Sequence, residues 1–192
     1  MAVAAVVFDL GETLVDETGI WTRVAEAAGV TPFTLMAGLG ATIALGRPHD
    51  DVWELLGIEC PEGRWAMDDW YPDALPCIAR LRGAGYRVYA SGNVPAFTEH
   101  DLRPHFDGVA SAETWGVWKP EPGFFARVVE LTGVPAERIA YVGDRVDNDV
   151  EPALAAGMVA VHIRRGPWGY LQAPPPGAIG VRSLDELPAR LP

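Results

Sequence analysis

The 192-residue sequence predicts an α/β fold, a parallel β-sheet with helices on both faces and a small helical insertion after the first strand. Two observations indicate this class. Short apolar runs of strand length alternate with stretches of helical periodicity, which is the order of elements in a parallel sheet built from strand–helix–strand units. Between residues 17 and about 70 the alternation stops, and helical patterns follow one another with no strong strand pattern.

Apolar runs predict the strands in chain order. A run without polar alternation is typical of a strand that is buried on both faces. The predicted strands cover residues 4–8, 86–90, 138–142 and 158–163, with a short additional strand at 108–110.

Helical spacing predicts the elements between these strands. Residues 72–82 place Leu75, Ile78 and Leu81 at i, i+3 intervals, and Pro72 and Gly83 suit the first turn and the end of a helix. Further helices are expected at 122–131, 148–156 and 183–191, and the proline- and glycine-rich stretch 166–180 predicts a loop. The insertion divides into helical segments at 20–28, 31–45 and 50–56. We therefore expect a Rossmann-like core from residues 1–16 and 71–192, and a small helical domain from 17–70.

Composition excludes several classes of function. The net charge of −11 argues against a nucleic-acid binder and against binding to an anionic membrane surface. The two cysteines, Cys60 and Cys77, form neither a disulfide framework nor a zinc motif. Because no signal-peptide pattern and no apolar run of membrane-spanning length is present, we expect a cytoplasmic protein.

Polar residues follow three of the predicted strands. Asp9 ends the first, Ser91 and Asn93 follow the second, and Asp144 and Asp149 follow the strand at 138–142. The carboxyl ends of parallel strands meet at one edge of a sheet, where ligands bind. Clustered carboxylates suit Mg²⁺, a carboxylate can attack phosphorus, and a hydroxyl and a lysine can hold phosphoryl oxygens. Lys119 is the sole lysine in the chain. Together, the carboxylates, the Ser91 hydroxyl and Lys119 predict phosphoryl chemistry.

Four motifs in this order resemble those of the haloacid dehalogenase-like (HAD) hydrolase superfamily. The D-x-D-x-T motif at the end of strand one is matched by F-D-L-G-E-T-L at Asp9 and Thr13. Y-A-S-G-N supplies Ser91, W-K-P-E-P supplies Lys119, and V-G-D-R-V-D-N-D matches the final acidic motif. The resemblance implies a Mg²⁺-dependent phosphatase for a small phosphorylated metabolite, with residues 17–70 as the small cap of the family.

The resemblance also implies a role for each matched residue. Asp9 would be the nucleophile and a metal ligand, and Ser91 and Lys119 would bind the transferring phosphoryl group. The further implied metal ligands are Asp144, Asp149 and the backbone carbonyl of Gly11, and the further implied substrate contacts are Thr13, Gly92 and Asn93.

Gly11 departs from the family pattern. Phosphatases of the family usually carry an aspartate at this position, for which the resemblance implies the role of general acid and base. Losing such a group costs about 10² to 10⁴ in rate. Glu12 could replace it, although an extended chain would point Glu12 to the other face. A cap acid such as Glu17, Asp50 or Asp51, or a substrate with a good leaving group, are the other possibilities.

Two further interpretations follow from Gly11. One is a catalytically degraded HAD fold that binds a phosphorylated ligand or a protein. The other is a different reaction of the family, but Asp144 and Asp149 argue against metal-free dehalogenation, and the lack of lysine in residues 17–70 argues against phosphonate hydrolysis. The histidines are expected to be structural or on the surface, since none has metal-ligand spacing: His49, His100, His105 and His162.

Overall fold

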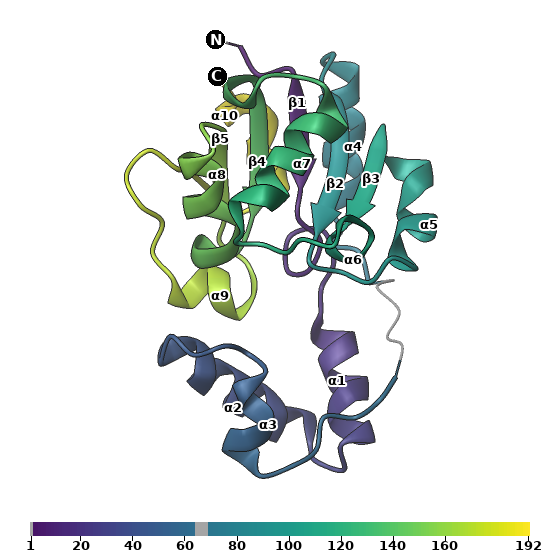
Figure 1. Cartoon of the computed structure of the whole chain (residues 1–192), viewed down its shortest axis with the longest axis vertical. Helices are drawn as coiled ribbons and strands as arrows, with labels where there is room; N and C mark the ends of the chain where they lie inside the picture. Colours follow the sequence, from purple (N-terminus) through teal and green to yellow (C-terminus); the bar gives the residue numbers. More distant parts are fainter. Residues whose placement is uncertain (1, 64–68) are drawn as a thin grey trace. The chain divides into compact units, whose positions relative to one another are not determined.

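The computed structural model describes residues 2–63 and 69–192 of the chain. The chain forms two compact units. One contains residues 1–15 and 70–192 and is called the core unit here, and the other contains residues 16–69 and is called the helical unit. Figure 1 shows both, with strands present in the core unit.

A six-stranded parallel sheet forms the centre of the core unit. Its strand order is β3-β2-β1-β4-β5-β6, so the chain starts in the middle and builds outward in both directions (Figure 1). β1 pairs with β2 on one side and with β4 on the other, placing Val6 beside Val88 and Ala140. The strands are β1 (Ala5–Phe8), β2 (Arg87–Gly92), β3 (Gly108–Ser111), β4 (Ile139–Gly143), β5 (Val159–Ile163) and β6 (Ile179–Val181).

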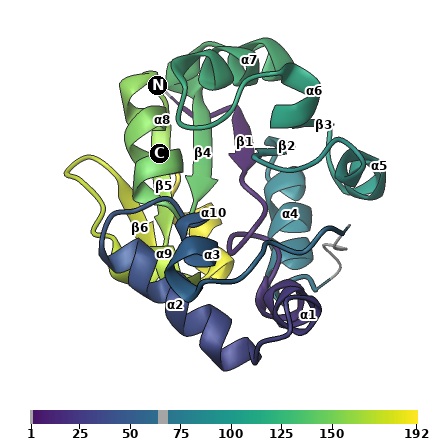
Figure 2. The same ribbon diagram turned by 60° about the horizontal axis from the view of Figure 1, so that its bottom comes forward.

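Helices cover both faces of this sheet, as the sequence predicts. In Figures 1 and 2, α7 and α8 lie over one face and α4 and α10 over the other. The α-helices of the core unit are α4 (Ala74–Gly83), α5 (Thr98–Leu102), α6 (Ala112–Trp115), α7 (Pro122–Thr132), α8 (Glu151–Ala155), α9 (Gly166–Leu171) and α10 (Leu187–Arg190). Shorter turns are η1 (Arg103–His105), η2 (Ala136–Arg138), η3 (Val146–Val150) and η4 (Leu184–Glu186).

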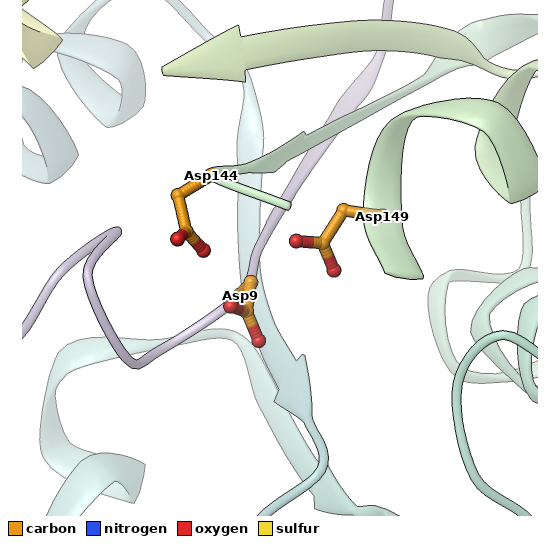
Figure 3. Close-up of side chains that lie close together, drawn as sticks. All are labelled: Asp9, Asp144 and Asp149. Carbon is orange, nitrogen blue, oxygen red and sulfur yellow. The ribbon is translucent and has the colours of Figure 1, made fainter. Parts of the chain in front are cut away.

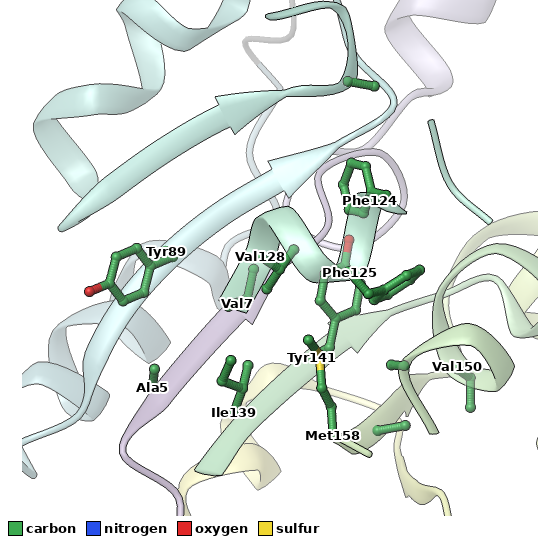
Figure 4. Close-up of a cluster of buried hydrophobic side chains, with 13 residues drawn as sticks. Ala5, Val7, Tyr89, Phe124, Phe125, Val128, Ile139, Tyr141, Val150 and Met158 are labelled. Carbon is green, nitrogen blue, oxygen red and sulfur yellow. The ribbon is translucent and has the colours of Figure 1, made fainter. Parts of the chain in front are cut away.

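The hydrophobic core on the α7 side explains why the strands read as continuous apolar runs. Val7 and Tyr141 project from β1 and β4 toward Phe124 and Phe125 of α7 (Figure 4). The Phe125 and Tyr141 rings meet edge to face at 5.3 Å, a favoured aromatic geometry. Alternate strand residues such as Val6 are equally buried, because helices also cover the opposite face.

The sequence-based prediction was wrong at the C-terminal end of the sheet. The stretch 166–180, expected to be a loop, contains helix α9 and the first residues of strand β6. Pro167 occupies the first turn of α9, where a missing N–H costs little, so proline there starts a helix instead of preventing one. The single helix expected at 148–156 is instead a π-helical turn, η3, followed by α8 with Pro152 in its first turn.

The helical unit contains α1 (Thr18–Ala27), α2 (Pro32–Ala44) and α3 (Asp51–Leu56). Thr31 caps α2 by accepting a hydrogen bond from the Thr34 amide at 3.2 Å. α2 and α3 approach closely at Gly38, where an added Cβ would lie 3.0 Å from Val52. Within residues 2–63 and 69–192, no single helix is long and apolar enough to span a membrane, although the bent pair of α1 and α2 passes the same test by length and composition.

Candidate active site

The predicted polar residues lie at the carboxyl edge of the sheet in the core unit. Asp9 directly follows β1, Ser91 lies near the end of β2, and Asp144 directly follows β4. The parallel register of β1 with β2 and β4 aligns these three strand ends, which are far apart in the sequence. Asp149 comes from the π-helical turn η3, which begins two residues after Asp144.

Three aspartates form a cluster at this edge. Asp9, Asp144 and Asp149 are all buried, and each offers a carboxylate oxygen so that the three atoms lie within 4.8 Å of one another. Figure 3 shows the three carboxyl groups pointing toward a common space. Three carboxylates this close repel one another, so the cluster needs positive charge.

Lys119 supplies one positive charge. Its Nζ donates to Asp9 Oδ1 and to Asp149 Oδ1, each at 2.6 Å, and its side chain is 3% exposed. Burial by itself would lower the pKa of Lys119, but Asp149 and Asp9 outweigh burial and hold that pKa well above its usual value. The lysine is therefore a permanent cation.

Asn93 fixes the backbone of Lys119. The Lys119 amide donates to Asn93 Oδ1 at 2.8 Å, and Asn93 Nδ2 donates back to the Lys119 carbonyl at 3.0 Å. This two-way contact joins the loop after β2 to the loop before α7. Asn93 thus positions the lysine in this structure, in addition to its predicted place among the substrate contacts.

Asp149 is the most deeply placed of the three acids. Its Oδ2 accepts the backbone N–H of Arg145 at 3.0 Å while Oδ1 accepts from Lys119. Burial raises the pKa of the Asp149 carboxyl to about 6, with Lys119 opposing the rise and Asp9 adding to it. The cluster therefore holds more negative charge than Lys119 alone offsets.

Two glycines allow the carboxylates to sit against the backbone. A Cβ at Gly92 would lie 2.6 Å from Asp9 Oδ1, and a Cβ at Gly143 would lie 2.3 Å from the Asp149 carboxyl group. Real Cβ atoms do not approach so closely, so both positions require glycine. The S-G-N motif indicates Gly92, whereas no sequence signal predicts the close approach of the Asp149 carboxyl group to Gly143.

Two buried hydroxyl groups stand at the same edge. Ser91 Oγ and Thr13 Oγ1 make no hydrogen bond with any of the described residues. Buried hydroxyls are normally paired, so an unpaired one at a site edge indicates a group that a ligand or water completes. The carbonyl of Ser91 accepts from the Tyr141 hydroxyl at 2.9 Å, which fixes this strand end.

Glu12 does not lie in an extended segment. Its φ of 52° places it in the left-handed region, its side chain is buried, and its Oε2 accepts from the Tyr71 hydroxyl at 2.6 Å. A Cβ at Gly166 would meet this carboxylate at 2.4 Å, so Gly166 makes room for it. The Glu12 carboxylate is therefore already hydrogen-bonded to Tyr71 in this structure.

Arg165 holds the loop that follows Asp9. It donates to the Thr13 carbonyl at 3.0 Å and to Asp73, and its guanidinium lies 4.0 Å from the centre of the Tyr71 ring. The loop after β5 therefore contacts the backbone of the segment that follows Asp9 at Thr13. No sequence signal distinguished Arg165 from the other arginines, because its partners lie far away along the chain.

The family model for haloacid dehalogenase-like hydrolases matches residues 3–157 of this chain. The chain belongs to the haloacid dehalogenase-like hydrolase family. The predicted superfamily and the Rossmann-like α/β fold are thereby confirmed.

Curated relatives of this chain include phosphatases of the HAD family. The glyceraldehyde 3-phosphate phosphatase of Methanopyrus kandleri is 36% identical over 104 residues, which are 51% of this chain and 45% of the relative. The chain spans about half the length of the curated relatives it matches first.

Solved HAD structures share the fold over nearly the whole chain. The HAD phosphatase of Thermococcus onnurineus has 23% identity and a TM-score of 0.64, with 97% of this chain and 96% of that chain covered. The L-2-haloacid dehalogenase of Xanthobacter autotrophicus has 21% identity and a TM-score of 0.71, with 97% of both chains covered. At these identities the likeness shows the HAD fold, and both kinds of chemistry occur on it.

The HAD site has donor groups that fit Mg²⁺. Asp9, Asp144 and Asp149 offer three hard carboxylate oxygens in one cluster, and the positive charge of Lys119 does not balance all three. Mg²⁺ favours oxygen ligands and binds through one or two carboxylates with water and phosphate oxygens completing its shell. Asp147, which lies between Asp144 and Asp149 in the sequence, accepts from Arg145 and Gln172.

His162 contacts the backbone of the site residue Asp144. It is buried on β5, and its Nε2 lies 3.0 Å from the Asp144 carbonyl. A carbonyl oxygen only accepts, so Nε2 carries the proton. Burial lowers the pKa of His162, which favours the neutral ring. The prediction that this histidine is structural agrees with that contact.

Proposed function

We propose that the protein is a Mg²⁺-dependent phosphatase that hydrolyses a small phosphorylated metabolite through an aspartyl-phosphate on Asp9. One observation carries the proposal. A single lysine bridges Asp9 and Asp149 while three buried carboxylates converge at the edge of the sheet. This arrangement presents one acidic nucleophile next to a cation that can hold phosphoryl oxygens.

Each residue has a defined part in the proposed reaction. The Asp9 carboxylate attacks phosphorus and the bond to the leaving oxygen breaks, so that the phosphoryl group is carried by Asp9 until water displaces it. Lys119 and the Ser91 hydroxyl hold the phosphoryl oxygens, and Thr13, Gly92 and Asn93 complete the substrate contacts. Asp9, Asp144, Asp149 and the Gly11 carbonyl would hold Mg²⁺, which when bound supplies positive charge to the phosphoryl oxygens.

The substrate class rests on the relatives. Those from Methanopyrus kandleri, Methanocaldococcus jannaschii and Pyrococcus abyssi are named glyceraldehyde 3-phosphate phosphatases, and one from Mesorhizobium japonicum is named phosphoglycolate phosphatase. Both names denote small phosphate monoesters. Together with the acidic composition, they favour a cytoplasmic enzyme for a free metabolite over one for nucleic acid or a membrane surface.

The helical unit is proposed as the cap that contributes substrate specificity. It follows the first motif in the chain, and it carries Glu17, Asp50 and Asp51. In the structure these acids are engaged inside the unit: Glu17 accepts from Trp21, Asp51 pairs with Arg47, and Asp50 lies near His49.

Gly11 favours a second candidate function, a HAD fold that binds a phosphorylated ligand or a protein without turnover. Without a side chain at position 11, no group there can protonate the leaving oxygen or activate water. Glu12, the neighbouring acid, is engaged by Tyr71. Proton transfer then relies on a different acid or on a leaving group that needs no acid.

Turnover of p-nitrophenyl phosphate with Mg²⁺ tests the two candidates. The phosphatase proposal expects turnover by the parent protein that is lost on addition of a chelator and in an Asp9→Asn variant. Turnover that survives Asp9→Asn would contradict the role of Asp9. If the parent shows no turnover while Gly11→Asp restores it strongly, the binding-only candidate is correct.

A further inference from the structure

A pocket lies in the core unit outside the carboxylate cluster. It has a volume of about 480 Å³ and is formed by β5, β6, helix α9 and the segment after α9. Figure 2 shows these elements adjacent to one another at one edge of the sheet. Pockets of about 300 to 1,000 Å³ accommodate small organic ligands.

Two arginines give this pocket a positive character. Arg164 and Arg182 line it, and among the described residues neither guanidinium forms an ion pair. Glu186 contributes the one carboxylate of the described lining, and its Oε1 accepts from the Arg182 backbone N–H at 3.3 Å. In a chain of net charge −11, two unpaired arginines on one hollow favour an anionic ligand.

An aromatic and apolar wall accompanies the arginines. The Arg164 guanidinium lies 4.9 Å from the centre of the Tyr170 ring, and Tyr170 is 65% exposed. Leu171, Pro174 and Val181 supply apolar surface in the same lining. A ligand that fits this wall carries a planar or apolar part in addition to its anionic group, so inorganic phosphate by itself is too small and too polar.

Two side chains of the pocket also contact the turn that carries the active-site acids. His162 donates from Nε2 to the Asp144 carbonyl at 3.0 Å. Gln172 accepts the Val146 N–H at 2.7 Å and donates to Asp147 at 2.9 Å. A ligand that moves either side chain therefore changes hydrogen bonds next to Asp144 and at the start of the turn η3, which holds Asp149.

We propose that this pocket is a regulatory site for an organic phosphate of the nucleoside monophosphate class. The phosphate binds Arg164 and Arg182, the planar base packs on Tyr170, and His162 and Gln172 transmit occupancy to the acidic turn. The site stands on its own lining, whereas the regulation of turnover rests on the proposed phosphatase function.

Calorimetric titration of the full chain with AMP tests the site. The titration is made with chelator present, so that phosphate binding at the carboxylate cluster is not supported by metal. We expect one AMP per chain, and at least about tenfold weaker binding of adenosine and of inorganic phosphate, because each offers part of the ligand. The Arg164→Ala/Arg182→Ala variant is expected to lose at least about tenfold in AMP affinity.

Control variants separate the pocket from other sites. Arg127→Ala removes an exposed arginine of α7 outside the pocket and is expected to keep the parent affinity for AMP. Tyr170→Ala, at a position that is 65% exposed, is expected to weaken the binding of AMP and not that of inorganic phosphate. The proposal is overturned if AMP does not bind at millimolar concentration, if the double variant binds it as the parent does, or if inorganic phosphate binds equally well.

The regulatory step is tested separately by turnover of p-nitrophenyl phosphate. AMP is expected to change kcat about fivefold or more, and Gln172→Met is expected to keep AMP binding while reducing that change. A change in KM with constant kcat would mean that AMP competes at the carboxylate cluster and would overturn the regulatory step. If the parent has no turnover, the phosphatase proposal fails, and the calorimetric result still decides the pocket.

Discussion

At the scale of single residues, Asp9 owes its position to the lack of a side chain at Gly92. A Cβ at residue 92 would lie only 2.6 Å from Asp9 Oδ1, and the same oxygen accepts from Lys119. Asp9, the proposed nucleophile, and Lys119 are therefore held by backbone geometry as well as by charge. Substitution of Gly92 by alanine tests whether the backbone at residue 92 positions Asp9.

Gly92→Ala is expected to lower kcat by about 10²-fold, since a displacement of about 1 Å at a reacting group has an effect of this size. The added Cβ would contact Asp9 Oδ1 at 2.6 Å and push the carboxylate away from Lys119. Steady-state kinetics with p-nitrophenyl phosphate measures the kcat of the variant and of the parent. Gly83→Ala is the matched control, because a Cβ there meets nothing within 4 Å. Equal kcat values for the two variants would contradict the role of Gly92.

Gly11→Asp is expected to raise turnover, because it supplies the carboxyl group that phosphatases of the family carry at this position. The gain should be larger for an alkyl phosphate than for p-nitrophenyl phosphate, whose leaving group needs little protonation, and it should reach about 10² to 10⁴ at most. Comparison of kcat for the two substrates measures it. Equal gains on both substrates would show that position 11 does not serve in proton transfer.

At the scale of elements, one carboxylate ties the first helix after the helical unit to the C-terminal segment. Asp73, just before α4, accepts hydrogen bonds from Arg165, from the Ser183 hydroxyl at 2.8 Å and from the Leu184 N–H at 2.9 Å. Burial raises the pKa of Asp73, but these hydrogen bonds and the charge of Arg165 outweigh burial and lower it. The ionised form is therefore favoured by folding.

Asp73→Asn is expected to reduce the free energy of unfolding at pH 7 by about 1.5 to 3 kcal/mol, the range for hydrogen bonds to a charged group. Because the folded pKa lies below the ordinary value of 3.8, the contribution of Asp73 is present above that value and is lost as the pH falls through the folded pKa. Urea unfolding at pH 7 and at pH 3 measures both effects. A difference between variant and parent that does not shrink at low pH would contradict this account.

The central strands and the site acids were predictable because their signals are local. An apolar run that ends on Asp9 needs no information from elsewhere in the chain, and Gly143 and Asp144 end the strand at 139–143 in the same way. Parallel pairing then brings the strand ends together. The predicted site residues accordingly lie in one cluster in the structure: Asp9, Asp144, Asp149 and Lys119.

Other features depend on partners that no local pattern reveals. Strand β6 has three residues and follows a proline-rich stretch. Its extended conformation therefore depends on pairing with β5 and could not be predicted from its own composition. An extended chain would point Glu12 to the other face, but its backbone is left-handed and its carboxylate accepts from Tyr71, 59 positions away. Arg165 and His162 likewise acquire their roles through contacts across the fold.

At the scale of the whole molecule, negative charge dominates. The chain carries a net charge of −11, and its buried acidic cluster holds three carboxylates for one lysine. A cation that binds the folded state and not the unfolded one stabilises the fold by mass action. The proposed binding of Mg²⁺ to the cluster therefore predicts that added metal stabilises the folded protein.

Mg²⁺ is expected to raise the free energy of unfolding by about 2.7 kcal/mol at a concentration 100 times its dissociation constant. Thermal unfolding with Mg²⁺ and with a chelator measures the difference as a shift in Tm. Asp144→Asn should reduce the shift, whereas Asp185→Asn, at an exposed surface ion pair, should leave it unchanged. A shift of equal size in the parent and in Asp144→Asn would place the metal elsewhere.

Acid quenching during turnover, followed by peptide mass spectrometry, tests the central claim most directly. The account predicts a phosphoryl group on the peptide that contains Asp9, removed by hydroxylamine as expected for an acyl phosphate and absent from Asp9→Asn. A protein that turns over substrate with no phosphoryl group on Asp9, or with the group on another residue, would contradict it.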